Sequence, residues 1–277
     1  MTYETLCHRL TTCYDAGEAK ALVRWVLDVR FGISLTDILC GKVTQLSADD
    51  QAELEKIMQR LEKGEPVQYI IGVADFAGRQ FKVAPGVLIP RPETAELCEW
   101  IISSGKGDRK HHLLDIGTGS GCIAITLAAA LPQAQVSAWD ISADALRIAQ
   151  ENAKALGVNV SFEQHDILNT SLHDAYDVIV SNPPYIKPSE RDEMAKNVLD
   201  YEPQIALFAP DDNPIIFYQK IAGFAWQNLN NEGLLFFELN PLTAEAVGEY
   251  LRQVGFSDIE FRQDAFGKLR FLKAKKI

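Results

Sequence analysis

The chain has 277 residues, 47% of them hydrophobic and 23% charged, so it can bury the core of one large domain or two. Its net charge of −11 argues against a partner recognised through a phosphate backbone, because such binding rewards Lys and Arg. No apolar run is long enough to cross a bilayer and the first residues do not resemble a signal peptide, so we expect no membrane contact.

The cysteines are odd in number and scattered, with no CxxC pair, which predicts reduced thiols in a cytoplasmic protein and argues against a zinc site. The five histidines show no metal-ligand spacing either, so we expect no metal. The cysteines are Cys7, Cys13, Cys40, Cys98 and Cys122.

Residues 1–72 are predicted to form a small helical domain. Apolar side chains recur at helical spacing around Trp25 and again around Ile57. Ser47 with Asp50 resembles a capping box in which Asp replaces the usual Glu, and it predicts the start of the second of these helices. The segment carries eight basic and eleven acidic side chains, against 19 and 27 in the rest of the chain, so neither part is basic.

From Val67 to Pro90 the apolar period changes to two, which predicts extended structure. A short hairpin is expected over residues 76–81, turning at Gly78. We interpret this stretch as a connector between two domains. A helix beginning at Glu93 or Thr94 and a polar surface loop over residues 103–110 are expected next.

From His112 onward, strands and helices alternate, which predicts an α/β domain with a mostly parallel sheet. Two further strands are expected around Ala265-Phe266-Gly267. The other predicted strands cover residues 112–116, 135–139, 160–164, 176–181 and 233–239. The predicted helices cover residues 120–131, 142–156, 214–230 and 242–254.

The first of these strands ends in a glycine-rich loop. Its glycines follow the pattern GxGxG, and Cys122 stands where a dinucleotide fingerprint would have its third glycine. Without a pyrophosphate to cradle, the natural ligand is a nucleoside with a charged amino-acid tail, and Asp115 would face a cationic group directly or through water. A generic strand–helix turn is the alternative. The ligand-binding residues expected here are Asp115, Gly117, Thr118, Gly119, Ser120 and Gly121.

Acidic residues follow the next two strands. Asp140, followed by Ile141, can accept hydrogen bonds from both hydroxyls of a ribose. Asp166 can accept from an adenine amino group while Ile167 packs on the ring, although a turn aspartate explains Asp166 equally well. Because carboxyl ends of parallel strands meet at one edge of a sheet, these residues should face a single crevice.

The fourth strand ends in Ser181-Asn182-Pro183-Pro184-Tyr185. A residue before a proline is driven toward extended geometry, and the two prolines have no N–H. The Asn182 side-chain oxygen and the carbonyls of Asn182 and Pro183 are therefore acceptors beside the aromatic face of Tyr185. Such a site suits a planar group that bears an NH2. A Pro-Pro turn that closes the strand is the alternative.

Together these motifs resemble those of class I S-adenosylmethionine-dependent methyltransferases, and Asn-Pro-Pro-Tyr resembles the signature of the branch that methylates planar amino groups. With the helical N-terminal segment, the hairpin and Leu88-Ile89-Pro90-Arg91-Pro92-Glu93-Thr94, the chain resembles the PrmC/HemK family over essentially its whole length. Members of that family are glutamine-N5 methyltransferases of peptide chain release factors.

The resemblance implies a Rossmann-like, seven-stranded sheet with one antiparallel strand, and S-adenosyl-L-methionine as cofactor. It implies class 1 release factors as protein substrates, whose Gly-Gly-Gln loop enters the crevice, without direct nucleic-acid, membrane or metal partners. The expected division is 1–72 for substrate recognition, 73–90 as a hairpin linker and 91–277 as the catalytic domain. Ile167 departs from the aromatic residue that family members can carry there.

We expect Asn182 and Pro183 to orient the substrate amide, each accepting one N–H, because an amide nitrogen is a poor nucleophile and needs orientation. Pro184 and Tyr185 would complete the substrate site, with Tyr185 against the amide plane. Asn182 would also lie near the methionine part of the cofactor. The final proton acceptor stays open.

Two charged residues have open roles. Glu238, at the end of a predicted strand, either approaches the site or has a sheet-edge or surface role. Arg91 either lies near the cofactor or forms a structural ion pair, for example with Glu93 or Glu96. Phe76 and Phe81 similarly either flank the site or pack the hairpin on the core.

Four other functions compete with this interpretation. A nucleic-acid amino-methyltransferase, acting on adenine N6 or guanine N2, would need a basic groove that neither half of the chain offers. A methyltransferase of another protein stays an alternative. A non-catalytic ligand-binding protein would not need the acceptors of residues 182–185, and a dehydrogenase is disfavoured by GxGxG.

Overall fold

A computed structural model of the chain describes residues 1–105, 110–170 and 174–277. The central part of the surface loop expected over residues 103–110 lies outside these residues. No helix among the described residues is both long and apolar enough to cross a membrane.

The described residues form two compact units. One unit comprises Met1–Val73 together with Ala195–Tyr201, and the other comprises Ala74–Met194 and Glu202–Ile277. The sequence offered no sign that Ala195–Tyr201 belongs with the N-terminal helices. The assignment of separate roles to residues 1–72, 73–90 and 91–277 stays a prediction.

The first unit is helical because polar caps begin its helices and an apolar stripe of each faces a shared core. Asp15 caps the second helix by accepting from Gly17 and Glu18 N–H, and Gly32 ends it at φ 64°. Arg9 binds Glu55 through both terminal nitrogens and Glu62 through Nε, joining the first helix to the fourth. The helices are α1 (Tyr3–Leu10), α2 (Ala16–Phe31), α3 (Leu35–Leu39), the 3₁₀ helix η1 (Lys42–Gln45), α4 (Ala48–Leu61), α5 (Val67–Ile71) and, from the later segment, α9 (Lys196–Tyr201).

Two details here differ from expectation. The period-two interpretation of the stretch after Pro66 is wrong at its start, since Val67–Ile71 is a helical turn ended by Gly72 in the left-handed region. The helical turn is closed by local backbone bonds, from the Ile70 N–H to the Pro66 carbonyl and from the Gly72 N–H to the Gln68 carbonyl. Ser47 caps α4, but the Asp50 carboxylate accepts from the Ser47 hydroxyl and does not complete a reciprocal box.

The second unit begins at Ala74, within the predicted hairpin formed by β1 (Val73–Phe76) and β2 (Arg79–Lys82). Its turn places Ala77 at φ 47° and Gly78 at φ 72°. Phe76 and Phe81 are buried, with ring centroids 5.8 Å apart. Of the two roles expected for these rings, the structure supports packing of the hairpin on the core. Helix α6 (Pro92–Ser103) follows, with its proline in the first turn.

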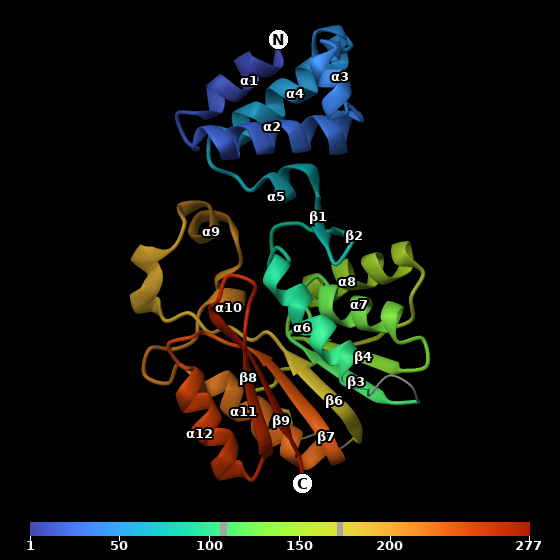
Figure 1. The fold of residues 1–277 in the computed structure, drawn as a ribbon, viewed down its shortest axis with the longest axis vertical. Helices are drawn as coiled ribbons and strands as arrows, with labels where there is room; N and C mark the ends of the chain where they lie inside the picture. The colour runs from blue at the N-terminus through green and yellow to red at the C-terminus, as the bar shows by residue number, and fades with distance from the viewer. Residues whose placement is uncertain (106–109, 171–173) are drawn as a thin grey trace. The chain divides into compact units, whose positions relative to one another are not determined.

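The predicted seven-stranded, mostly parallel sheet is confirmed, in the order β5-β4-β3-β6-β7-β9-β8 (Figure 1). Among the described strands, β9 alone runs opposite to the other six, and it pairs antiparallel with β7 and β8. The strands are β3 (His112–Ile116), β4 (Gln135–Asp140), β5 (Ser161–Gln164), β6 (Tyr176–Ser181), β7 (Leu229–Glu238), β8 (Ser257–Gln263) and β9 (Leu269–Lys275).

Helices cover both faces of the sheet, as its nearly continuous apolar strands require (Figure 1). One buried cluster joins the sheet to α6, α7 (Cys122–Ala130) and α8 (Ala143–Leu156). The other joins it to α11 (Ile216–Asn228) and α12 (Ala244–Val254). Between β6 and α11 the chain forms the 3₁₀ helix η2 (Pro188–Glu193), α9 and α10 (Gln204–Leu207).

Candidate active site

The register of the sheet brings the predicted site residues to one edge. Ile116 pairs with Trp139 on one side and with Ser181 on the other, so the glycine loop, Asp140 and Asn182 follow at the same level. Ser181 in turn pairs with Phe237, which places Glu238 beside Asn182 along the edge. The expectation that these motifs share the carboxyl ends of adjacent strands holds for the described residues.

The three glycines of the loop serve two purposes. Gly117, Gly119 and Gly121 all have positive φ, at 76°, 55° and 82°. A Cβ on Gly117 or Gly119 would meet no atom within 4 Å, so the backbone there borders open space that a ligand can enter. A Cβ on Gly121 would lie 2.8 Å from Ile125 Cδ1 and 3.0 Å from Ala149 Cβ, so this glycine lets α7 pack closely on α8.

The Asp115 carboxylate is fully buried beneath this loop. Its Oδ2 accepts from Thr118 Oγ1 at 2.6 Å and from the Ala124 N–H at 3.2 Å. Its Oδ1 is buried without a hydrogen-bond partner among the described residues. Burial raises the pKa of Asp115 to about 7, because the charged form loses its hydration. An orphaned carboxylate oxygen fits the amino group of an amino-acid ligand, which would supply the missing donor.

Asp140 links the loop to the next strand. Its Oδ2 accepts from the Gly119 N–H at 2.8 Å and its Oδ1 from the Ser142 N–H at 2.9 Å. Desolvation raises its pKa, although these backbone donors oppose that shift. A carboxylate oxygen has two lone pairs, so each retains one for a ribose hydroxyl. The neighbouring Ile141 is 46% exposed, which leaves an apolar side chain uncovered beside the acid.

Asp166 is held by its own turn. Its Oδ1 accepts from the Leu168 N–H at 2.9 Å, and its Oδ2 from Asn169 Nδ2 at 2.6 Å. These are the bonds of the turn aspartate that the sequence left open, and the adenine contact stays a prediction. Ile167 is half-buried and packs on the cluster beneath α11.

The segment after β6 is anchored to the sheet at Ser181 and then presents the side-chain amide of Asn182. Ser181 is buried and donates to the Ile116 carbonyl at 2.6 Å, tying the strand end to β3. Pro183 is buried, and Asn182 and Pro184 are half-buried. Among the described residues, none forms a hydrogen bond with the Asn182 side chain. Its acceptor and both donors are therefore available to a ligand.

The phenol of Tyr185 points to a carboxylate. Its hydroxyl donates to Glu238 Oε1 at 3.1 Å, while Thr94 Oγ1 donates to Oε2 at 2.7 Å. Glu238 is 2% exposed and lies on an interior strand, so the sheet-edge or surface role is wrong. Desolvation raises the pKa of Glu238, and it raises the pKa of Tyr185 well above its usual range. Tyr185 is therefore a neutral donor and not a base.

Arg91 forms an ion pair, but neither Glu93 nor Glu96 is its partner. Its Nη2 lies 2.5 Å from Oε1 of Glu202, whose Oε2 accepts from the Ile89 N–H at 3.1 Å. Glu202 is 4% exposed, so Arg91 and the Ile89 N–H compensate a buried charge. The pairing holds the Ile89–Arg91 segment in place through a residue more than a hundred positions away.

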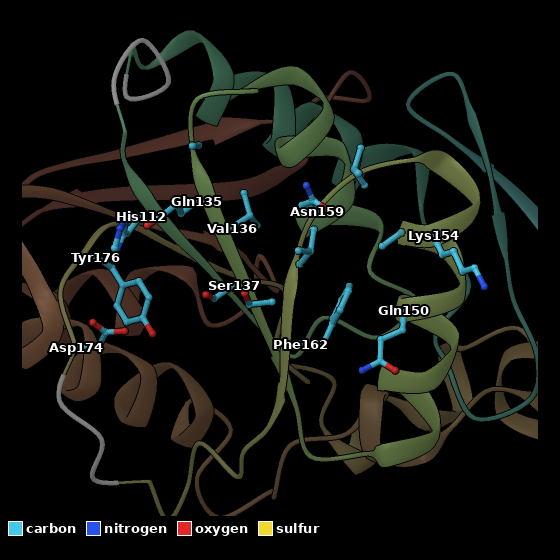
Figure 2. A pocket seen from close by; sticks show the side chains of 15 residues that line it. His112, Gln135, Val136, Ser137, Gln150, Lys154, Asn159, Phe162, Asp174 and Tyr176 are labelled. Carbon is cyan, nitrogen blue, oxygen red and sulfur yellow. The ribbon is translucent and has the colours of Figure 1, made fainter.

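The surface also has hollows that lie away from these residues. One of about 810 Å³, shown in Figure 2, includes the first residues of four strands, His112, Gln135, Ser161 and Tyr176. It contains none of the predicted site residues and lies toward the amino ends of the strands, where the parallel-sheet rule places no ligand. Its size therefore does not make it the active site. Among the described residues, no group of three His, Cys, Asp or Glu could hold a metal.

Comparison with known proteins identifies the family of the chain. The profile of the PrmC N-terminal domain matches residues 4–72, and that of the methyltransferase small domain matches residues 98–204. The release factor glutamine methyltransferase of Bacteroides thetaiotaomicron is 46% identical over 96% of both chains. The chain belongs to the release factor glutamine methyltransferase family. The Flavobacterium psychrophilum member is 39% identical over 95% of this chain and 94% of its own.

Solved structures of other methyltransferases are similar to this chain in fold. A 16S rRNA N2 G1207 methyltransferase of Thermus thermophilus superposes with a TM-score of 0.54 at 20% identity, over 74% of this chain and 50% of its own. A Pyrococcus furiosus methyltransferase gives 0.53 at 17% identity, over 83% and 99%. At these identities the likeness concerns the fold alone, which is that of class I methyltransferases.

Of the two buried carboxylates Glu238 and Glu202, the sequence indicates the first only with its role left open and does not indicate the second. Glu238 carried one usable signal, an acid directly after the apolar run Leu234–Phe237 at the carboxyl end of a strand. Glu202 carried none, because it lies in a polar segment between short helices.

Proposed function

We propose that this enzyme transfers the methyl group of S-adenosylmethionine to the side-chain amide nitrogen of a glutamine in peptide chain release factors. The single observation that carries the proposal is the partner-free Asn182 amide, held between the glycine loop and Glu238 at the carboxyl edge of the sheet. Family membership supports the methyltransferase activity and the release factor as substrate.

The residues around the loop fit the cofactor. Asp115 Oδ1 lacks a donor that the cofactor's amino group can supply. Asp140 and the exposed Ile141 suit the ribose and the adjoining ring, and Asp166 with Ile167 suits adenine. Gly117 and Gly119 border open space where the amino-acid part can approach the backbone. Thr118, Ser120 and Gly121 shape the loop.

The bound cofactor supplies an activated methyl group on a sulfonium. The remaining task is to orient an amide whose nitrogen lone pair is delocalised into its carbonyl. In the proposed mechanism the Asn182 side-chain oxygen and the Pro183 carbonyl each accept one N–H of the substrate. These bonds strengthen as the nitrogen pyramidalises and gains positive charge, which stabilises the transition state.

Tyr185 and Pro184 would enclose the amide. The Tyr185 ring is held by the hydrogen bond to Glu238, which a second bond from Thr94 fixes in turn. A ring fixed at both its backbone and its hydroxyl keeps one face toward the substrate and excludes water. Glu238 is thus a positioning residue, because it acts through Tyr185.

The finer substrate assignment is the N5 nitrogen of the glutamine in the Gly-Gly-Gln motif of class 1 release factors. Residues 1–72 would contact the body of that protein, since they carry none of the cofactor motifs and match the PrmC N-terminal domain. Residues 73–90 would link them to the catalytic residues 91–277. Translation termination occurs on cytoplasmic ribosomes, so this substrate supports a cytoplasmic location. The proposed reaction itself requires no direct nucleic-acid, membrane or metal partner.

The deciding experiment uses labelled S-adenosylmethionine with a release factor and, separately, with tRNA and rRNA. Label should enter the release factor at its Gly-Gly-Gln glutamine. Asn182→Ala should lower the single-turnover rate by about 10²–10³-fold, by analogy with the loss of one oxyanion-hole donor. Cofactor affinity should change much less, and Asn159→Ala, at an exposed position, should change neither. Label in nucleic acid, or a near-normal rate in folded Asn182→Ala, would contradict the proposal.

A further inference from the structure

A hollow of about 510 Å³ opens directly beside Tyr185. Its lining comes from Tyr185 and Ile186, from η2 and Met194, from the turn Asn240–Leu242 after β7, and from the start of β9. It lies wholly within the second unit. Tyr185, the residue proposed to pack against the substrate amide, is therefore also part of the wall of this second space.

Hydrogen bonds connect the segments that form the walls of the hollow. Asn240 is 5% exposed, and its Nδ2 donates to the Tyr185 carbonyl at 3.1 Å and to Glu190 Oε2 at 3.1 Å. Glu190 Oε1 also accepts from the Lys187 N–H at 3.0 Å. One buried amide thus ties the strand end that carries Tyr185 to η2, so the hollow exists before any ligand arrives. A preformed space costs little to occupy.

The rim of the hollow has features that suit a polypeptide. Leu242 lines it and is 71% exposed, so it offers an apolar contact at the mouth of the hollow. Glu193 and Lys268 line it from different elements, and neither has a charged partner among the described residues. An apolar contact flanked by charges of both signs suits a peptide, whereas a phosphate backbone rewards an excess of basic side chains, which this lining of two acids and two bases does not have.

We propose that this hollow binds the residues of the release factor that adjoin the target glutamine in its chain. The inference rests on the proposed function and adds a subsite to it. A glutamine side chain alone offers few contacts, and contacts to the neighbouring residues would fix the backbone from which it projects. Binding energy gained there orients the amide at Asn182, which is the main requirement for this reaction.

Site-specific photocross-linking tests the contact directly. The full-length enzyme carries p-benzoylphenylalanine in place of Leu242, and a matched control carries it in place of Gln150, which lines the hollow of Figure 2. After irradiation with a release factor and S-adenosylmethionine, adducts at position 242 should map within about five residues of the glutamine, since each extended residue adds about 3.4 Å. The Gln150 variant should give none there.

A kinetic arm uses Leu242→Asp in the same full-length enzyme. It should lower kcat/KM for the release factor at least tenfold, mainly through KM, while cofactor affinity by calorimetry stays unchanged. A purely structural role would move cofactor affinity or kcat as well. Unchanged kinetics, or adducts confined to distant parts of the release factor, would overturn the subsite.

The two proposals fail in different ways. If the wild-type enzyme methylates the release factor but cross-links from position 242 map elsewhere, only the subsite is wrong. If the wild-type enzyme leaves that release factor unmethylated, the proposed function fails and the subsite falls with it.

Discussion

The phenolic oxygen of Tyr185 lies 3.1 Å from Oε1 of Glu238, a buried carboxylate whose other oxygen is 2.7 Å from the Thr94 hydroxyl. The bond joins the segment after β6 to the end of β7, the neighbouring strand. It compensates a charge that burial would otherwise make costly. It also restrains the aromatic ring that adjoins both Asn182 and the hollow beside it.

Tyr185→Phe should reduce the free energy of unfolding by about 1–3 kcal/mol, because Glu238 then loses a donor in a buried position. The ring stays, so the single-turnover rate should fall less than it does in Tyr185→Ala. Chemical denaturation and single-turnover methylation measure the two effects. Tyr250→Phe, at a half-buried tyrosine of the same unit, is the control. Equal rates in Tyr185→Phe and Tyr185→Ala would remove the ring from the mechanism.

Asp115 should make the stability of the cofactor-free enzyme depend on pH. Burial raises its pKa from 3.8 to about 7, so the folded state holds a proton that the unfolded state releases. Its contribution to stability is therefore greatest below about pH 4 and is lost as the pH rises toward 7. Relative to wild type, Asp115→Asn should gain stability between pH 5 and pH 8, on the order of 1 kcal/mol or more. Denaturation curves at both pH values give the free energies of unfolding. If the difference between Asp115→Asn and wild type is the same at both, Asp115 does not titrate in its buried position with a raised pKa.

Asp140→Ala should weaken S-adenosylmethionine binding by about 1–3 kcal/mol, because the acceptors for the ribose hydroxyls are lost. The structure adds a second cause, since the Gly119 N–H also loses its acceptor and the loop is less restrained. Isothermal titration calorimetry measures the affinity. Asp144→Ala removes an exposed carboxylate four residues later and should leave binding unchanged. Equal affinities for a folded Asp140→Ala variant and wild type would reject the ribose assignment.

The first unit should contribute to recognition of the protein substrate. Leu35 and Leu39 lie four residues apart on α3 and are 48% and 80% exposed. Leu39→Asp should lower kcat/KM for the intact release factor about tenfold, or roughly 1.4 kcal/mol of binding, with unchanged cofactor affinity. Ile277→Asp, at another exposed apolar residue, is the control. If both variants behave like wild type, this face of the helical unit does not contact the substrate.

Much of the site was predictable from local sequence. A strand followed by GxGxG, acids after the next two strands and Asn-Pro-Pro-Tyr after the fourth are local signals. Parallel strands with right-handed crossovers must bring their carboxyl ends to one edge, so order along the chain becomes proximity in space. Turn chemistry is local as well, which is why the hairpin turn at Gly78 followed from residue type.

Only the tertiary structure decided which distant groups meet. Glu238 reaches Tyr185 across 53 residues, and Glu202 reaches the Ile89 N–H across 113. No periodicity connects such pairs, because each depends on strand order, register and the path of the segment after β6. Burial decided the charge states in the same way, since Asp115 is an ordinary acid in the chain and gains its raised pKa only when the loop and α7 exclude water from it.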